Sequence, residues 1–205
     1  MTELPMTPGP PKNPPPPSVV VLGRFQPFHR GHAQMLEFAD RWRSENMPNA
    51  SLVVAVGSSN RPENLRNPWT HLERSEMINK WLEFSSIKDM PIIVPIPDIE
   101  DPPNWVAHAE LYHGISGVFI SSDIPLLDLY ADSGWITVQM PMKARHELVG
   151  WRVRETARMM STISDKDAVL EVLKPSIPVS VIKMMISKGL LKRLAFLSEG
   201  GEPVG

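Results

Sequence analysis

The sequence predicts an α/β fold, a Rossmann-like, doubly wound, parallel five-stranded sheet with C-terminal helices. Short runs rich in valine and isoleucine alternate with longer segments of helical periodicity, and strands that alternate with helices form parallel sheets covered on both faces. The runs at 18–22 and 52–56 have the composition of strands that are buried on both faces. A chain of 205 residues, 42% of them hydrophobic, is long enough for one such domain with a small helical appendage.

The elements can be placed in order along the chain. We expect strands at 18–22, 52–56, 91–95, 118–121 and 135–138. We expect helices at 30–45, 70–84, 104–112, 124–130, 150–162, 166–172 and 178–195. Thr70 suits the N-cap of the second helix, and Glu73 at its third position would complete a capping box.

The first 17 residues differ from the rest because they hold eight of the 22 prolines. Such a segment cannot form a helix or a central strand and has little to bury, so we expect a disordered or polyproline-II tail. A ligand for a proline-binding domain is the alternative. The predicted organisation is a tail at 1–17, a main domain at 18–163, and a helical appendage at 164–205 that packs on the domain or on a neighbouring subunit.

Composition excludes several classes of function. The net charge of −2 and a pI of about 6.3 give no basic field for nucleic acid. The sequence has no cysteine for a disulfide or a thiolate metal site. No apolar run approaches the roughly 20 residues of a membrane helix, and the N-terminal residues do not resemble a secretory signal. We therefore expect a cytoplasmic protein that binds neither nucleic acid nor membrane.

Residues 23–32, which read G-R-F-Q-P-F-H-R-G-H, lie between the first strand and the first helix. Ligands of open α/β sheets bind at the carboxyl ends of strands, near the point where the strand order reverses. Gly23 permits a close approach of the backbone to a ligand, and Gly31 leaves the start of the helix uncrowded. A helix N-terminus offers free N–H groups and a positive partial charge, so this loop is suited to phosphate.

Two histidines lie in the same loop. His29 and His32 are three residues apart, so their rings point to the same side of the first helical turn and form a donor pair for an anion. A zinc pair is the alternative, but it needs a third ligand. We expect no metal ion bound by protein side chains.

The whole string closely resembles the archaeal type of nicotinamide-nucleotide adenylyltransferase, within the H-x-G-H nucleotidyltransferase superfamily. The resemblance continues at Gly57-Ser58, at 67–74 (N-P-W-T-H-L-E-R), and at 95–100 (P-I-P-D-I-E), which is followed by Trp105-Val106. It covers residues 19–160 in the family's order. The main domain is then expected to be a nucleotidyltransferase domain.

Two segments depart from the family pattern. Residues 149–154 read V-G-W-R-V-R where the family has S-G-T-x-[IV]-R, so Val149 and Trp151 replace two hydroxyl donors. Asp123 stands where the family tends to have an amide. These departures leave two alternatives open. One is an H-x-G-H enzyme with a different phosphorylated acceptor, such as a sugar phosphate, an alcohol phosphate or a flavin nucleotide, and the other is a nucleotide-binding protein with weakened turnover.

The resemblance implies condensation of nicotinamide mononucleotide (NMN) with ATP to give NAD and pyrophosphate, with Mg²⁺ carried by ATP and a homo-oligomeric assembly. The catalytic residues it implies are His29, His32, Arg24 and Arg154. The ATP-binding residues it implies are Gly23, Arg24, Phe25, His29, Gly31, His32, Asp123, Gly150 and Arg154. The NMN-binding residues it implies are Gln26, Ser58, Arg74, Asp98, Ile99 and Trp105, with Trp105 stacked on the nicotinamide ring.

Simpler interpretations of some of these residues remain. Arg74 could pair with a helix neighbour such as Glu73, and Arg154 could belong to a solvated charged face. Trp105 could be a core residue. Core positions are also expected for Trp69, Trp81, Trp135 and Trp151.

Overall fold

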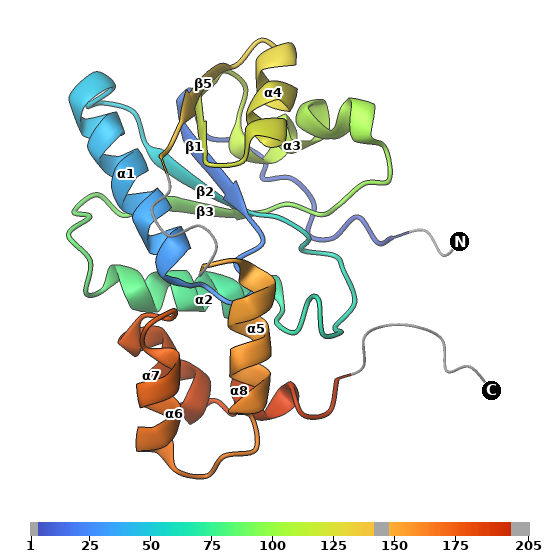
Figure 1. Ribbon diagram of the computed structural model, residues 1–205. Helices are drawn as coiled ribbons and strands as arrows, with labels where there is room; N and C mark the ends of the chain where they lie inside the picture. Colours follow the sequence, from blue (N-terminus) through green and yellow to red (C-terminus); the bar gives the residue numbers. More distant parts are fainter. Residues whose placement is uncertain (1–3, 142–147, 198–205) are drawn as a thin grey trace. The chain divides into compact units, whose positions relative to one another are not determined.

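The computed structural model describes residues 4–141 and 148–197. Its sheet has five strands in the order β3-β2-β1-β4-β5, and all neighbouring pairs are parallel (Figure 1). The strands are β1 Ser18–Gly23, β2 Leu52–Val56, β3 Ile92–Pro95, β4 Gly117–Ser121 and β5 Ile136–Gln139. The predicted fold class is confirmed, because the strands are parallel, are separated by helices, and precede a run of C-terminal helices.

The helices follow the predicted order with one correction. They are α1 Arg30–Asn46, α2 His71–Leu82, the short 3₁₀ helix η1 Pro102–Asn104, α3 Trp105–His113, α4 Ile124–Asp132, α5 Gly150–Met159, α6 Lys166–Leu173, α7 Val179–Ser187 and α8 Leu190–Arg193. The prediction of one helix at 178–195 is wrong. Gly189 adopts a φ of 68°, in the left-handed region that ends helices, and separates α7 from α8. The predicted capping box of α2 is confirmed, with Thr70 as N-cap and Glu73 as its partner.

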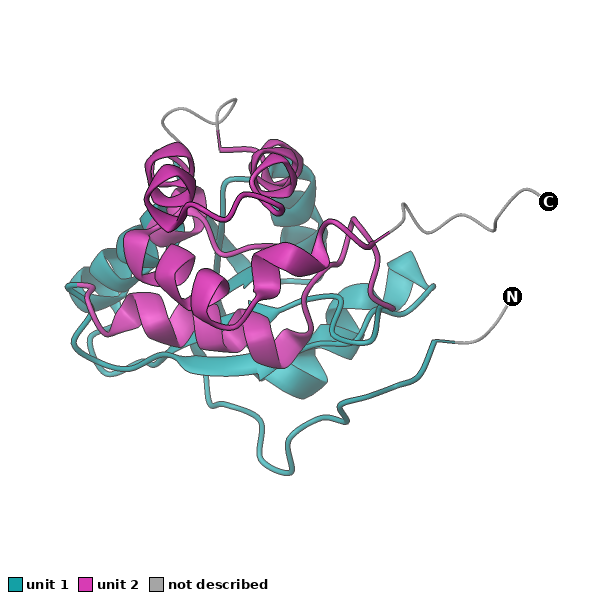
Figure 2. Cartoon of the chain, turned by 90° about the horizontal axis from the view of Figure 1, so that it is seen from below, with its two compact units in different colours: residues 1–24, 34–61, 86–143 teal, residues 25–33, 62–85, 144–205 magenta. Residues whose placement is uncertain are grey.

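The chain divides into two compact units (Figure 2). Unit 1 draws its residues from 1–24, 34–61 and 86–143 and contains the whole sheet. Unit 2 draws its residues from 25–33, 62–85 and 144–205 and contains α2 and α5 to α8. The helix α1 begins in unit 2 and continues into unit 1. The predicted boundaries at residues 17 and 163 stay predictions.

Unit 1 is built around the sheet, with α3 and α4 on one side and α1 on the other (Figure 1). Alternate strand residues such as Val20 and Phe119 face α3 and α4 and form a buried cluster with them. The ring of Phe119 stacks on Tyr130 of α4 with centroids 3.6 Å apart, and Trp135 meets the edge of Tyr130. The strand order reverses between β1 and β4, so the carboxyl ends of these two strands mark the switch point of unit 1.

Unit 2 has its own helical core. The ring of Phe28 packs on Trp81 of α2 with centroids 5.1 Å apart. Buried residues of α2 and α7, among them Met77, Ile182 and Met185, complete the interior, and α2 contacts α7. Of the C-terminal helices, α7 packs against α2 within this unit, and α6 and α8 pack against α7.

Residues 4–17 form neither helix nor strand, and most of their side chains are exposed. Their described contacts with the rest of unit 1 include a hydrogen bond from the hydroxyl of Tyr112 to the carbonyl of Pro8, 3.2 Å long. In the described part of the chain, no helix combines the length and the apolar character needed to cross a membrane.

Candidate active site

His29 and His32 lie against each other at the start of α1 in unit 2. Their rings stack with centroids 3.7 Å apart and planes 25° apart, which confirms that both point to the same side of the first turn. His29 is buried, with 4% of its surface exposed, whereas His32 is half-buried. The ring of Phe25 lies 4.6 Å from that of His32 and closes one side of the pair.

The backbone N–H groups at the start of α1 are all paired within unit 2. The N–H of Arg30 donates to the carbonyl of Ser176, and that of Gly31 donates to Nδ1 of His29. The N–H groups of His32 and Ala33 both donate to the carbonyl of His29. The expectation of free backbone donors here is therefore wrong, because the His29 side chain folds back and acts as a cap. What remains at this helix end is its partial positive charge and the histidine rings.

The hydrogen bonds of the two rings determine which nitrogen carries the proton. Nδ1 of His29 accepts from Gly31 at 3.1 Å, and Nδ1 of His32 accepts from the N–H of His29 at 3.3 Å. A neutral imidazole that accepts at Nδ1 carries its proton on Nε2. Each ring therefore has its proton on Nε2, and the His32 ring also lies within hydrogen-bonding reach of the carbonyl of Pro27.

Both rings are neutral at physiological pH. Burial, together with the charge of Arg154, lowers the pKa of His29 to about 4. Burial and the proximity of His29 lower the pKa of His32 well below its usual range, although the carbonyl of Pro27 opposes this. The pair is therefore a set of neutral donors at neutral pH.

Arg154 and Gly150 of α5 lie beside His29 in the same unit. Nη1 of Arg154 donates to the carbonyl of Gln26 at 2.8 Å. A Cβ added at Gly150 would lie 3.4 Å from Nη1 of Arg154 and 3.9 Å from Nε2 of His29. The start of α5 thus brings a guanidinium and a backbone without a side chain to the Nε2–H group of His29.

The segment at 67–74 is joined to the histidine loop through Gln26. Nε2 of the buried Gln26 side chain donates to the carbonyl of Trp69 at 2.8 Å, and its Oε1 accepts from the N–H of Trp69 at 3.1 Å. Arg74 is fully buried in α2, with its Nε donating to the carbonyl of Thr70 at 3.2 Å. The side chain of Gln26, which is predicted to bind NMN, thus forms its hydrogen bonds with the protein itself.

In unit 1, two residues that the sequence reasoning missed hold the predicted Asp98. The Asn60 side chain pairs with both backbone groups of Asp98, accepting its N–H at 2.8 Å and donating to its carbonyl at 2.9 Å. Nε of Arg61 donates to the Asp98 carboxylate at 2.7 Å. The backbone N–H of Asp98 is thus paired within unit 1, and the roles of Asp98 and Ile99 toward NMN stay predictions. No spacing rule signals these pairs, which join residues 37 and 38 positions apart.

The other predicted residues of unit 1 follow the carboxyl ends of strands or lie on α3. Gly23 ends β1 and the exposed Arg24 follows it, and Ser58 lies after β2 with a φ of 54°. Asp123 is the exposed N-cap of α4, without a side-chain capping bond. Trp105 is half-buried and packs against the edge of the unit 1 core.

The departures at the start of α5 have a visible structural effect. Val149 is the N-cap of α5 and has no side chain that can accept a capping hydrogen bond. Trp151 is 55% exposed, with the guanidinium of Arg152 over its ring at 5.2 Å. The expectation that Trp151 is a core residue is wrong, whereas Trp69, Trp81 and Trp135 are buried as expected.

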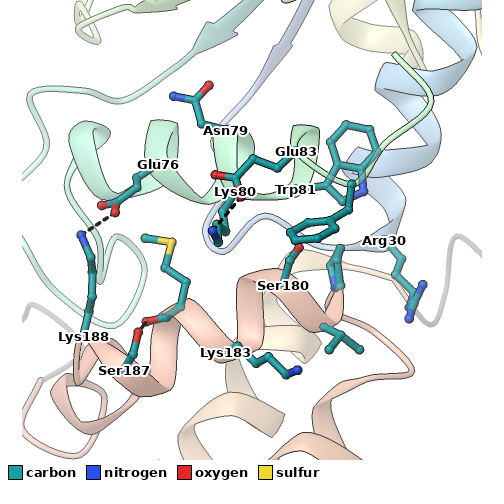
Figure 3. A pocket seen from close by; sticks show the side chains of 14 residues that line it. Arg30, Glu76, Asn79, Lys80, Trp81, Glu83, Ser180, Lys183, Ser187 and Lys188 are labelled. Atoms are coloured by element: carbon teal, nitrogen blue, oxygen red, sulfur yellow. Dashed lines mark hydrogen bonds and ion pairs between the residues drawn. The ribbon is translucent and has the colours of Figure 1, made fainter. Parts of the chain in front are cut away.

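A cavity of about 850 Å³ lies within unit 2 between α2 and α7 (Figure 3). Arg30, Trp81 and Lys183 are among its lining residues, and the ion pair of Lys188 with Glu76 spans it. None of the predicted site residues lines it. This cavity is therefore distinct from the histidine pair described above.

The strand order of the sheet reverses beside its first strand, and an H-x-G-H loop follows that strand. This combination is typical of α/β nucleotidyltransferases. The sequence profile of the family described as cytidylyltransferase-like matches residues 20–176. The chain is 33% identical to the nicotinamide-nucleotide adenylyltransferase of Thermoplasma acidophilum, over 66% of this chain and 72% of that one. It is 30% identical to the enzyme of the same name from Picrophilus torridus, over 89% of this chain and 98% of that one.

Solved structures share the fold. One is the crystal structure of a bifunctional NMN adenylyltransferase/ADP ribose pyrophosphatase from Francisella tularensis, with a TM-score of 0.64 and 17% identity. A second crystal structure of such a bifunctional protein from that organism, complexed with AMP and a manganese ion, has a TM-score of 0.58 and 18% identity. The match covers 88% of this chain and about half of each of those chains, 53% and 52%. The chain belongs to the cytidylyltransferase-like family and, by its curated relatives, to the nicotinamide-nucleotide adenylyltransferases within it, which makes it a nucleotidyltransferase.

Proposed function

We propose that this protein transfers the adenylyl group of ATP to the 5′-phosphate of NMN, forming NAD and releasing pyrophosphate. The observation that carries the proposal is the cluster of His29, His32, Arg154 and Gly150 in unit 2, where neutral N–H donors and a guanidinium lie around a backbone that has no side chain. The names of the curated relatives supply the acceptor, NMN.

The reaction needs alignment more than acid–base chemistry. An oxygen of the NMN phosphate forms a bond to the α-phosphorus of ATP, and the bond from that phosphorus to the bridging oxygen breaks. The electron pair leaves on pyrophosphate. Because the second pKa of a phosphate monoester is about 6, the nucleophile is already ionised at neutral pH and no general base is required. The protein has to position the reacting groups and stabilise the charge that moves to the leaving group.

In unit 2, we assign the triphosphate to the histidine loop and the start of α5. Nε2–H of His29 and of His32 would donate to phosphate oxygens, with His32 nearest the α-phosphate, and Arg154 would supply positive charge. Phe25 would fix the His32 ring, and Gly31 and Gly150 would leave room for the phosphates. The bound anion would raise the lowered pKa of His29 towards its ordinary range, because it compensates for the cost of charging a buried ring.

The remaining roles come from the resemblance. Arg74 would bind the NMN phosphate, and the buried Gln26 would hold the loop that lies against NMN. In unit 1, Trp105 would stack on the nicotinamide ring, Ile99 would offer backbone groups, and Asp98 would shape that turn through its pairs with neighbouring side chains. The ATP-binding residues of this unit would be Gly23, Arg24 and Asp123. Ser58 would bind NMN.

We propose Mg²⁺ as the ion that accompanies ATP. Within residues 4–141 and 148–197, no group of three or more His, Asp or Glu side chains has the arrangement of a metal site. The ion would take its ligands from phosphate oxygens and water, as Mg²⁺ commonly does, and would neutralise charge on the phosphates. The cytoplasmic location and the homo-oligomeric assembly are also retained as proposals.

A panel of acceptors tests the proposal. Purified protein with ATP and Mg²⁺ is offered NMN, nicotinic acid mononucleotide, flavin mononucleotide, ribose 5-phosphate and glycerol 3-phosphate, and pyrophosphate release is measured. We expect release with pyridine nucleotides alone. Release with a different acceptor would reassign the substrate, and tight ATP binding without release for every acceptor would mean that the changes at Val149 and Trp151 have removed turnover.

A further inference from the structure

The short helix α8, near the end of the described chain, is joined to the segment at 67–74 by several hydrogen bonds within unit 2. The guanidinium of Arg193 donates two hydrogen bonds, of 2.7 and 2.6 Å, to the carboxylate of Glu73. The same guanidinium donates to the carbonyl of Pro68 at 3.0 Å. The carbonyl of Leu190 accepts from the indole N–H of Trp69 at 3.2 Å. The segment is thus held at three residues, Pro68, Trp69 and Glu73, by one turn of helix.

These contacts continue to the histidine loop. Trp69 is 1% exposed, and its backbone N–H and carbonyl both pair with the Gln26 side chain. The carbonyl of Gln26 accepts from Arg154, whose guanidinium lies beside Gly150 and His29. Hydrogen bonds, joined by the covalent chain at Pro68-Trp69 and within Gln26, therefore lead from Arg193 to the residues around the proposed phosphate site.

The link between Arg193 and Glu73 is stronger than an ordinary surface ion pair. It has two parallel N–H···O bonds, and the two side chains are 29% and 20% exposed. Glu73 also accepts from the N–H of Thr70 at 2.9 Å as part of the capping box. Although burial opposes it, the hydrogen bonds from Arg193 and Thr70 lower the pKa of the Glu73 carboxyl, so this group is ionised at neutral pH.

We propose that Arg193 is a positioning residue for the adenylyl transfer: through Glu73 and Pro68 it fixes Trp69, and through Gln26 it fixes the loop that carries His29 and His32. This inference rests on the proposed function and extends it to a helix outside the segments that resemble the family. Misplacement of reacting groups by about 1 Å can cost up to 10²-fold in rate, so a loop that loses one of its anchors turns over more slowly without losing its donors.

The experiment separates positioning from stability. Arg193→Ala, Arg193→Lys and the control Lys188→Ala are assayed for NAD formation well below their melting temperatures, with kcat and KM for NMN and ATP corrected for the folded fraction. Lys188 pairs with Glu76 of α2, so Lys188→Ala, like Arg193→Ala, removes an ion pair to α2. Unlike Glu73, however, Glu76 lies outside the 67–74 segment. A second readout, independent of catalysis, is the hydrogen-exchange rate of the Trp69 amide, whose acceptor is Gln26.

We expect Arg193→Ala to lower kcat about tenfold and to speed exchange of the Trp69 amide, because both depend on the register of the loop. Lys188→Ala should leave both unchanged. Arg193→Lys should fall between wild type and Arg193→Ala, since lysine keeps the positive charge but lacks the planar, two-pronged set of N–H donors that holds Glu73 and Pro68 together. Equal kcat and equal Trp69 exchange in Arg193→Ala and Lys188→Ala would overturn the inference while the proposed function stands. If wild type forms no NAD, the proposed function fails, and the exchange rates alone still decide whether Arg193 anchors the loop.

Discussion

The depressed pKa of His29 leads to a quantitative prediction about stability. The ring is neutral in the folded protein down to a pKa of about 4, whereas in the unfolded chain it has the ordinary value of 6.5. Between these values the unfolded state binds a proton that the folded state does not. The free energy of unfolding must therefore fall as pH is lowered below about 6.5, until the folded state also protonates near pH 4.

The size of the effect follows from the two values. A difference from 6.5 to about 4 corresponds to about 3 kcal/mol once both states are protonated, and to about 2 kcal/mol between pH 7 and pH 5. Substitution of His29 by Gln removes this contribution and retains a carbonyl that can accept from Gly31 and an amide that can donate. When the pH is lowered from 7 to 5, the free energy of unfolding should therefore fall by about 2 kcal/mol less in the variant than in wild type.

Urea unfolding followed by circular dichroism at pH 7 and pH 5 measures this difference. His29 is also one of the causes that lower the pKa of His32, so its removal raises that pKa. This further reduces the loss of stability of the variant at low pH. A proton NMR titration of wild type, with the His29 signal assigned from the variant, gives the pKa directly. Parallel stability profiles for the two proteins, or a His29 signal that titrates near 6.5, would refute the reasoning.

Three further predictions concern the same unit. Arg154→Ala should lower kcat for NAD formation about 10²-fold, because a charged donor is lost beside His29; an unchanged kcat would place the phosphates elsewhere. Gly150→Ala should reduce kcat/KM for ATP, since the added Cβ fills the space between Arg154 and His29, while urea unfolding shows stability unchanged or raised by up to about 1 kcal/mol. Thr70→Ala should reduce the free energy of unfolding by about 1 kcal/mol, because it removes the cap hydrogen bond to Glu73, and an undiminished urea midpoint would contradict the assignment of the cap.

Local patterns made much of the fold predictable. Short runs rich in apolar and β-branched residues located all five strands, and the spacing of Thr70 and Glu73 located the capping box, because these signals depend on residues close in sequence. The split between α7 and α8 was missed because apolar residues continue past Gly189, and only its positive φ ends the helix. Trp151 was misplaced because an isolated tryptophan carries no periodicity that could distinguish an exposed side chain from a buried one.

The candidate site was predictable in its residues and less so in its hydrogen bonds. The spacing of His29 and His32 predicted that their rings lie on the same side. It did not predict that His29 accepts a hydrogen bond from the N–H of Gly31, because this depends on the conformation of the His29 side chain. The pairing of Arg193 with Glu73 joins positions 120 residues apart, and no local rule connects them. Polar contacts at such separation are set by packing of whole helices, which a single sequence does not display.

The central claim is that the α-phosphorus of ATP is transferred to NMN, and one labelling experiment tests it most directly. Wild-type protein is given NMN, Mg²⁺ and ATP that carries oxygen-18 at the bridge between the α- and β-phosphorus, and both products are analysed by mass spectrometry. Attack at the α-phosphorus breaks the bond to the labelled oxygen, so NAD should be unlabelled and all of the label should appear in pyrophosphate. Absence of NAD, or pyrophosphate without the label, would contradict the account.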